Sequence, residues 1–236
     1  MSDRNAIHKS SLPQLIKRGY IDYLPIEDDH YTYDESLAKL QSKMAVERSI
    51  AARTLKQHIL KKGVAEELIN ALIKEKALYT KLEISDALAL GNRTTLLLML
   101  PYVGSMKNHQ YDVVPKQPSR KKSFPLPRDG IARIIGKMNS IYIPLLIEKL
   151  FECSLLQARE LADAIGYMIY QKKKLPRKSY DLLFEYYLSC EDEVLQWKLF
   201  RAIAVSTPYS KAFLQSIRKE DTILAKEAIH ALKSYY

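Results

Sequence analysis

Six charged residues occupy one position of a repeated helical pattern, and arginines alternate strictly with acids among them. In chain order they are Arg53, Asp86, Arg133, Asp163, Arg201 and Glu227. Carboxylates beside guanidinium groups could form an acid–base constellation or hold a ligand. Alternation is also what stacked helices would select, because opposite charges on neighbouring helices fix their register. We favour this structural interpretation, a charge ladder, since paired catalytic carboxylates would need like charges side by side.

A second charged group lies between Ser105 and Arg128, where six basic residues face one acidic residue. The basic residues are Lys107, Lys116, Arg120, Lys121, Lys122 and Arg128. The same window holds four of the ten prolines, which predicts an insertion loop at about residues 104–126. A loop of this length is usually functional. Arg120, Lys121, Lys122 and Arg128 are therefore candidate binding residues for an acidic partner or a polyanion.

Tyrosines gather near a further basic stretch, residues 172–177. They are Tyr167, Tyr170, Tyr180, Tyr186 and Tyr187. Tyrosines beside lysines could stack on nucleic-acid bases and contact phosphates. Packing between helices beside a solvated turn is the alternative, and we favour it.

Motifs of enzymes and metal sites are absent from the sequence. It has no glycine-rich phosphate loop, no metal-spaced His/Cys set and no nucleophile elbow. Cys153 and Cys190 alone make neither a disulfide framework nor a zinc site. We expect a chain that is not an enzyme, with no catalytic residue, cofactor or metal. No apolar run nears the roughly 20 residues that span a bilayer, so we expect no membrane span and a cytoplasmic location.

The elements that carry these residues are expected to be helices. The segment from Pro125 to Leu150 predicts a helix, a turn at residues 138–140 and a second helix. Ile131, Ile134, Ile135 and Met138 form one apolar face, whose first position we call x. The same face recurs with x at residues 51, 84, 131, 161, 199 and 225. With 47% hydrophobic residues and 7 glycines, the chain is predicted to be all-α.

Helix boundaries and domains follow from this pattern. We predict helices over residues 35–61, 64–75, 78–91, 93–103, 155–170, 176–189, 193–206 and 208–219, and a last one capped by Asp221. Residues 1–34 are expected to form an arm that caps the first repeat, and residues 35–236 a single domain. The six ladder residues stand at x+2, about 150° from the centre of the apolar face, and should therefore point to solvent.

The repeated element resembles a known family. The residues from Pro127 to Gly136, followed by Ile143-Pro144-Leu145-Leu146, are similar to HEAT repeats, including the short bacterial variety. The resemblance implies an α-solenoid of about five to six two-helix repeats, whose x-bearing helices line a concave face. The family's arginine falls at x−3. That position holds Arg48, Lys81 and Arg128 here, but Ala158, Gln196 and Thr222 in the second half.

Two functions follow as hypotheses. The first is a non-enzymatic scaffold that binds a protein through the concave face and the basic loop, with Arg48 and Lys81 as further candidate contacts. The alternative is nucleic-acid binding through the basic residues. Some HEAT-like solenoids act on alkylated DNA bases, an activity that needs aromatic residues and a carboxylate in the groove. Trp197 with Asp163 is the one such combination.

Overall fold

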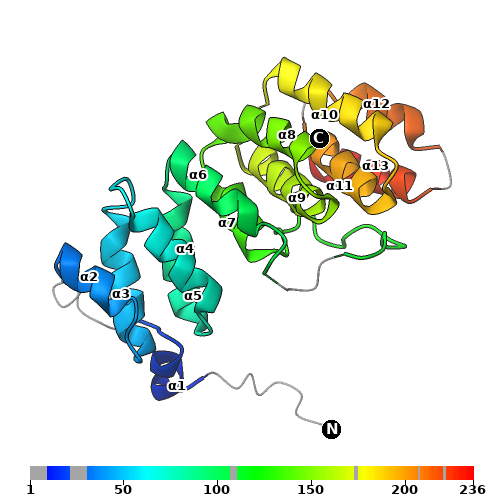
Figure 1. Cartoon of the computed structure of the whole chain (residues 1–236). Helices are drawn as coiled ribbons and strands as arrows, with labels where there is room; N and C mark the ends of the chain where they lie inside the picture. The colour runs from blue at the N-terminus through cyan, green and yellow to red at the C-terminus, as the bar shows by residue number, and fades with distance from the viewer. Residues whose placement is uncertain (1–9, 22–30, 107–110, 173–174, 207, 220–221) are drawn as a thin grey trace, which may run out of the picture. The chain divides into compact units, whose positions relative to one another are not determined.

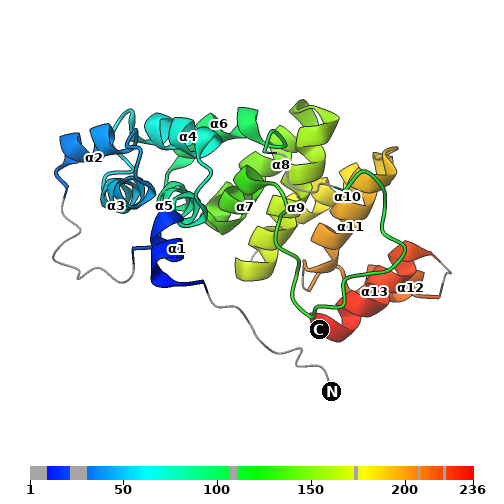
Figure 2. The same cartoon turned by 90° about the horizontal axis from the view of Figure 1, so that it is seen from below.

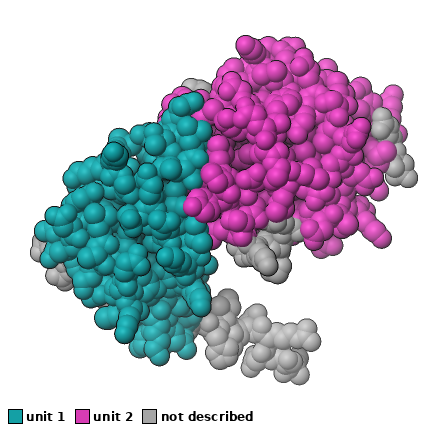
Figure 3. Space-filling model, viewed as in Figure 1, with its two compact units in different colours: residues 1–98 teal, residues 99–236 magenta. Residues whose placement is uncertain are grey.

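The computed structural model describes residues 10–21, 31–106, 111–172, 175–206, 208–219 and 222–236. Within these ranges every regular element is a helix, which confirms the all-α prediction. The chain divides into two compact units, Met1–Leu98 and Met99–Tyr236, shown in separate colours in Figure 3. Whether one solenoid domain runs from residue 35 to residue 236 stays a prediction from the sequence.

The first unit consists of short helices packed in pairs. They are α1 (Leu12–Lys17), α2 (Tyr33–Lys39), α3 (Ala45–Lys56), α4 (Val64–Lys74), α5 (Leu78–Ala89) and α6 (Arg93–Met99), which ends at the boundary. Helix α3 packs against α2 and α5, and α4 packs against α5 (Figure 1). Ala51, Leu55, Ile84 and Leu88 are buried where α3 and α5 meet, as the apolar pattern predicts.

The helix predicted over residues 35–61 is wrong, because the chain turns between α2 and α3. The hydroxyl of Ser42 accepts a hydrogen bond from the Met44 amide, at 3.0 Å. The Ser42 carbonyl accepts one from Nη1 of Arg48, at 2.8 Å. Serine competes for backbone hydrogen bonds in this way and so favours turns over helix interiors. The first helix of the predicted segment is therefore α2, and the x-bearing helix begins only at Ala45.

The second unit holds the remaining helices. They are α7 (Gly130–Lys137), α8 (Ile143–Glu152), α9 (Leu155–Lys172), α10 (Arg177–Ser189), α11 (Glu193–Ala204), α12 (Lys211–Ile217) and α13 (Ile223–Ser234), with short 3-10 turns at Leu100–Tyr102 and Ser140–Tyr142. The predicted helix–turn–helix after Pro125 is present as α7 and α8. Its first helix starts at Gly130, because the Asp129 carboxylate accepts the Ala132 amide at 2.8 Å and caps the helix. Asp221 lies outside the described residues, and Thr222 caps α13.

Packing in the second unit repeats from one helix pair to the next. Helices α8, α10 and α12 pack against α9, α11 and α13 respectively, and α7, α9, α11 and α13 each contact the next in that order (Figures 1 and 2). The predicted apolar faces of α7, α9 and α11 are fully buried. On α13, Ile229 keeps 38% of its surface exposed.

In the described part of the chain, no single helix has the length and hydrophobicity needed to cross a membrane. The one apolar pair of successive segments, Gly130–Lys137 with Ser140–Glu152, is bent by 110°.

Two glycines let the central helices of the second unit approach closely. Both stand five positions after x, Gly136 on α7 and Gly166 on α9. A Cβ on Gly166 would lie 3.1 Å from Cα of Ala202 on α11 and 2.5 Å from the Phe124 ring. A Cβ on Gly136 would lie 2.9 Å from the Tyr167 ring. These contacts are tighter than packed side chains adopt, so any larger residue would push the helices apart.

Gly166→Ala is expected to destabilise the protein, although alanine favours helix formation. Overpacking against the α11 backbone costs about 1–3 kcal/mol, more than the roughly 1 kcal/mol of helix propensity gained. Gly130→Ala is the matched control, since its Cβ would meet only the flexible end of Met106 at 3.0 Å. Thermal unfolding followed by circular dichroism measures both. Equal melting temperatures for the two variants would contradict the close-approach argument.

Candidate binding site

A cluster of buried charges joins α9 to α11. Nζ of Lys198 lies 2.7 Å from Oε1 of Glu160 and 2.9 Å from Oδ2 of Asp163. Nη1 of Arg201 lies 3.6 Å from Oδ1 of Asp163. The Lys198 and Glu160 side chains are each 1% exposed. We call these four residues the ion cluster.

Burial controls the protonation of the carboxyl groups here. It raises the pKa of Glu160, an effect that the neighbouring Lys198 opposes and that nearby Asp163 and Asp129 reinforce. It also raises the pKa of Asp129, against hydrogen bonds from backbone amides. Among the described residues, Oε2 of Glu160 and Oδ2 of Asp129 are buried without a hydrogen-bond partner. One carboxylate oxygen of the ion cluster, on Glu160, is therefore not satisfied by the cations beside it.

The basic loop covers this region of α11. Its described part, residues 111–129, contains no helix. Two arginines and three aromatic rings of the loop and α11 form a row that we call the arginine–aromatic stack: Arg128, Tyr111, Trp197, Arg201 and Phe124. Cζ of Arg128 lies 3.8 Å from the centre of the Tyr111 ring, and the Tyr111 and Trp197 ring centres lie 5.0 Å apart. Cζ of Arg201 lies 4.6 Å from the Trp197 ring centre and 5.0 Å from that of Phe124. Such contacts hold guanidinium groups against ring faces.

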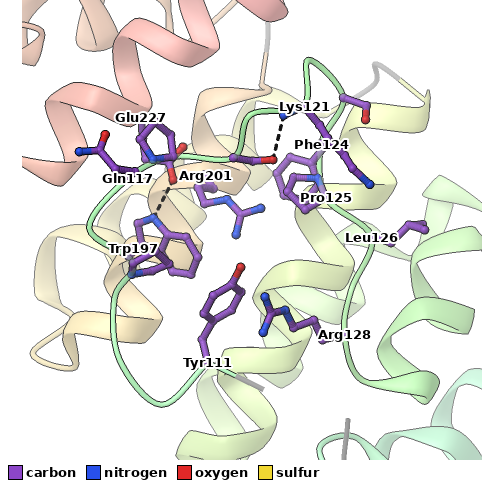
Figure 4. Close-up of a pocket in the computed structure, with 14 residues that line it drawn as sticks. Tyr111, Gln117, Lys121, Phe124, Pro125, Leu126, Arg128, Trp197, Arg201 and Glu227 are labelled. Carbon is purple, nitrogen blue, oxygen red and sulfur yellow. Dashed lines mark hydrogen bonds between the residues drawn. The ribbon is translucent and has the colours of Figure 1, made fainter. Parts of the chain in front are cut away.

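A pocket of about 520 Å³ lies between the loop and the helices. All five residues of the stack line it, together with Lys121, Leu126 and Glu227 among others (Figure 4). Glu227, on α13, accepts a hydrogen bond from Nε1 of Trp197 at 3.0 Å. The pocket is therefore built by the loop, α11 and α13, and it combines aromatic surface with fixed charges. Pockets of this size bind small molecules or single side chains of a partner.

The residues of the charge ladder differ in their exposure to solvent. Asp86 and Arg133 are exposed, as expected for position x+2. Asp163, Arg201 and Glu227 are buried, against that expectation. The loop packs over α11 and α13 at this point, so a position facing away from the helix core still loses contact with water.

The ladder residues also differ in their partners. Asp163 and Arg201 form an ion pair across α9 and α11. Arg53 pairs with Glu83, at 2.6 Å from Nη2 to Oε1. Arg133 donates to the Pro127 carbonyl at 3.0 Å, and the Glu227 carboxylate accepts from Trp197.

The candidate binding residues fall into two groups. Arg120, Lys121 and Lys122 are exposed on the loop, and Arg128 is half-buried at the pocket. Arg48 and Lys81 belong to the first unit.

Arg48 has a structural partner. Its Nε and Nη2 donate to the two carboxylate oxygens of Glu75 at 2.7 and 2.8 Å. Lys81 is half-buried on α5. Of the six candidates, Lys121 and Arg128 line the loop pocket, and Arg48 lines a separate one within the first unit.

The tyrosine cluster is largely interior. Tyr180 and Tyr187 are buried, and each packs against Phe184. Lys173 and Lys174 lie outside the described residues. The described tyrosines therefore support the packing interpretation.

Four residues at this site were not identified from the sequence: Tyr111, Phe124, Lys198 and Glu160. The sequence around Lys198 could have indicated its burial. Lys198 and Arg201 are the two charged residues in the segment from Trp197 to Ile203, whose other residues are all apolar. A lysine in such a run must be buried beside an acid. No local pattern marks the loop aromatics. Among the described residues, no group of three or more His, Cys, Asp or Glu is placed to hold a metal ion.

Lys198→Met is expected to cost about 3–5 kcal/mol of stability, because it leaves buried carboxylates without their closest cation. Lys149→Met is the matched control, since its ion pair with Glu152 is exposed and should contribute under about 1 kcal/mol. The double variant Glu160→Leu with Lys198→Met should regain much of the loss, as Asp163 keeps Arg201. Urea unfolding measures all three. Equal losses in the Lys198 and Lys149 variants would contradict the buried-cluster account.

Asp129→Asn should alter the pH dependence of stability. The pKa of Asp129 is raised above its ordinary value of 3.8, so the folded state keeps this proton when the unfolded state has lost it. Its contribution to stability is full below pH 3.8 and declines as pH rises through the folded pKa. Asparagine still caps α7 but cannot ionise. The variant should therefore gain stability relative to the natural protein as pH rises from 3.8 through the raised folded pKa of Asp129. Urea unfolding of both proteins at several pH values measures the difference. If the free energies of unfolding of the variant and the natural protein change in parallel with pH, the prediction is wrong.

No family model, no curated protein and no solved structure matches this chain. The likeness to HEAT repeats therefore remains a prediction from the sequence.

Proposed function

We propose that the chain is a non-enzymatic binding scaffold of the α-solenoid type that recognises a protein partner at the pocket beneath the basic loop. The proposal has two parts, the architecture and the partner, and each rests on different observations.

The repeated packing of the second unit supports the architecture. The helices pair as α8–α9, α10–α11 and α12–α13, and the second helices of successive pairs contact one another, α9 with α11 and α11 with α13. The buried x faces lie at these contacts. A helix pair cannot bury its apolar stripe alone, so stacking of this kind is what a solenoid requires.

The mixed chemistry of the loop surface carries the functional proposal. Leu126 lines the pocket and is 51% exposed, and Val113 on the same loop is 73% exposed. Exposed Arg120 and Lys121 lie on that loop as well. Apolar side chains next to cations suit an acidic protein segment that also offers hydrophobic residues.

A protein fits this surface better than a polynucleotide. The exposed Leu126 and Val113 contribute nothing to phosphate contacts, which are made by charged and polar groups.

Fluorescence anisotropy tests the choice. A labelled acidic peptide containing leucine and phenylalanine should bind, and its affinity should fall only modestly between about 50 and 200 mM salt, whereas a nucleic-acid complex would weaken by orders of magnitude. Leu126→Ser should weaken the peptide about fivefold or more, and the double change Lys121→Glu with Lys122→Glu should weaken it further.

The double change Lys62→Glu with Lys74→Glu is the charge-matched control, since both lysines are exposed on the first unit. It should leave peptide binding unchanged. Tighter binding of duplex or single-stranded DNA or RNA, with a steep salt dependence and no effect of Leu126→Ser, would overturn the proposal in favour of nucleic-acid binding.

A further inference from the structure

Several hydrogen-bond donors point into the same part of the pocket. In Figure 4 the guanidinium groups of Arg128 and Arg201 and the hydroxyl of Tyr111 point toward the same part of the pocket. The two arginines come from different segments, the loop and α11, and ring contacts hold both. A guanidinium whose face lies on a ring still presents its N–H groups along its edge.

The charge of the lining favours an anion. Lys121, Arg128 and Arg201 are its cations, and Glu227 is its one carboxylate, which leaves a formal charge of +2 among the lining residues. Oε1 of Glu227 already accepts from Trp197. Asp163 neutralises part of the charge of Arg201 from the helix side. Because Arg201 is only 7% exposed, its attraction for an anion is screened less than that of a surface charge.

The number and arrangement of donors fit a phosphate monoester better than a carboxylate. A phosphate monoester carries a charge of about −1.5 to −2 and three terminal oxygens at pH 7. Two guanidinium edges and one hydroxyl supply a donor for each oxygen. A carboxylate has two oxygens and half the charge, and one bidentate arginine satisfies it.

We propose that this pocket binds a phosphate monoester carried by the protein partner, such as a phosphorylated serine. The inference rests on the proposed function, because the exposed Leu126 and Val113 are what favour a peptide around the phosphate. The arginine–aromatic stack holds the phosphate, and the loop surface contacts the residues beside it.

The chain contains one tryptophan, Trp197, and it lines the pocket. Its fluorescence therefore reports on this site alone. The probes are a short phosphoserine peptide with neutral apolar neighbours, the same peptide with serine, the same with glutamate, inorganic phosphate, and a 5′-phosphorylated oligonucleotide. We expect a saturable change with the phosphopeptide, and affinity at least about tenfold weaker for the serine and glutamate peptides.

Three variants locate the binding. Arg128→Gln should weaken the phosphopeptide about tenfold or more, and Tyr111→Phe, which keeps the ring contacts, should weaken it severalfold. Lys178→Gln is the control, because Lys178 is exposed on α10 and does not line the pocket. It should have no more than a small effect. Circular dichroism of Tyr111→Phe and Lys178→Gln confirms folding.

Each result supports or overturns a stated part. If the phosphorylated and unphosphorylated peptides bind with equal affinity and the fluorescence of Trp197 does not change, the phosphate site is overturned. The protein-binding function then still stands. Inorganic phosphate that binds as tightly as the phosphopeptide supports the phosphate chemistry and contradicts the peptide-binding function. An oligonucleotide that binds more tightly than the phosphopeptide overturns the peptide as the occupant. No response to any phosphate probe overturns the inference outright.

Discussion

The second unit depends on the ion cluster between α9 and α11. Removing a charged group from water costs several kcal/mol, and Lys198, Glu160, Asp163 and Arg201 are all buried. They are tolerable only when held at ion-pair distance, so the cluster fixes how α9 and α11 lie against each other. Arg201 extends this constraint outward, because its guanidinium also contacts Trp197 and Phe124. Trp197 in turn donates a hydrogen bond to Glu227, so the position of α13 also depends on the ion cluster. Through these contacts, the buried charges between α9 and α11 also position one further helix, α13, and the loop.

Two other arginines also fix how neighbouring helices pack, and their ion pairs are less buried than the ion cluster. Arg159 on α9 pairs with Asp192, which caps α11, at 2.6 Å. The hydrogen bond from Arg159 holds the pKa of Asp192 below its ordinary value. Arg48 on α3 pairs in the same way with Glu75, which precedes α5. In both units an arginine on one x-bearing helix thus contacts an acid at the start of the next. These pairs hold the register between successive helices.

The sequence predicts the regular part of this fold well. The apolar faces at x, x+3 and x+4 are buried on α5, α7, α9 and α11, because helical periodicity is a local property. The break between α2 and α3 was missed because the apolar pattern continues through it, while Ser42 ends the helix by hydrogen bonding to its own neighbours. The residues of the candidate site were harder to predict from the sequence than the helices. Tyr111 and Phe124 belong to a loop without periodicity, and only their packing against α11, far along the chain, gives them a role. Burial of the last ladder residues has the same long-range cause.

The position of the loop in the chain has a consequence for biosynthesis. Residues 111–128 are made before α11 and α13, the helices on which Tyr111 and Phe124 rest. Contacts between segments so distant in sequence form late, because a long stretch of chain must be ordered first. The N-terminal part of a growing chain folds while the rest is still being made. The loop therefore leaves the ribosome with its cations unattached to any surface, and the pocket exists only once the C-terminal helices have been added. Helices α11 and α13 are thus the last elements needed to complete the pocket.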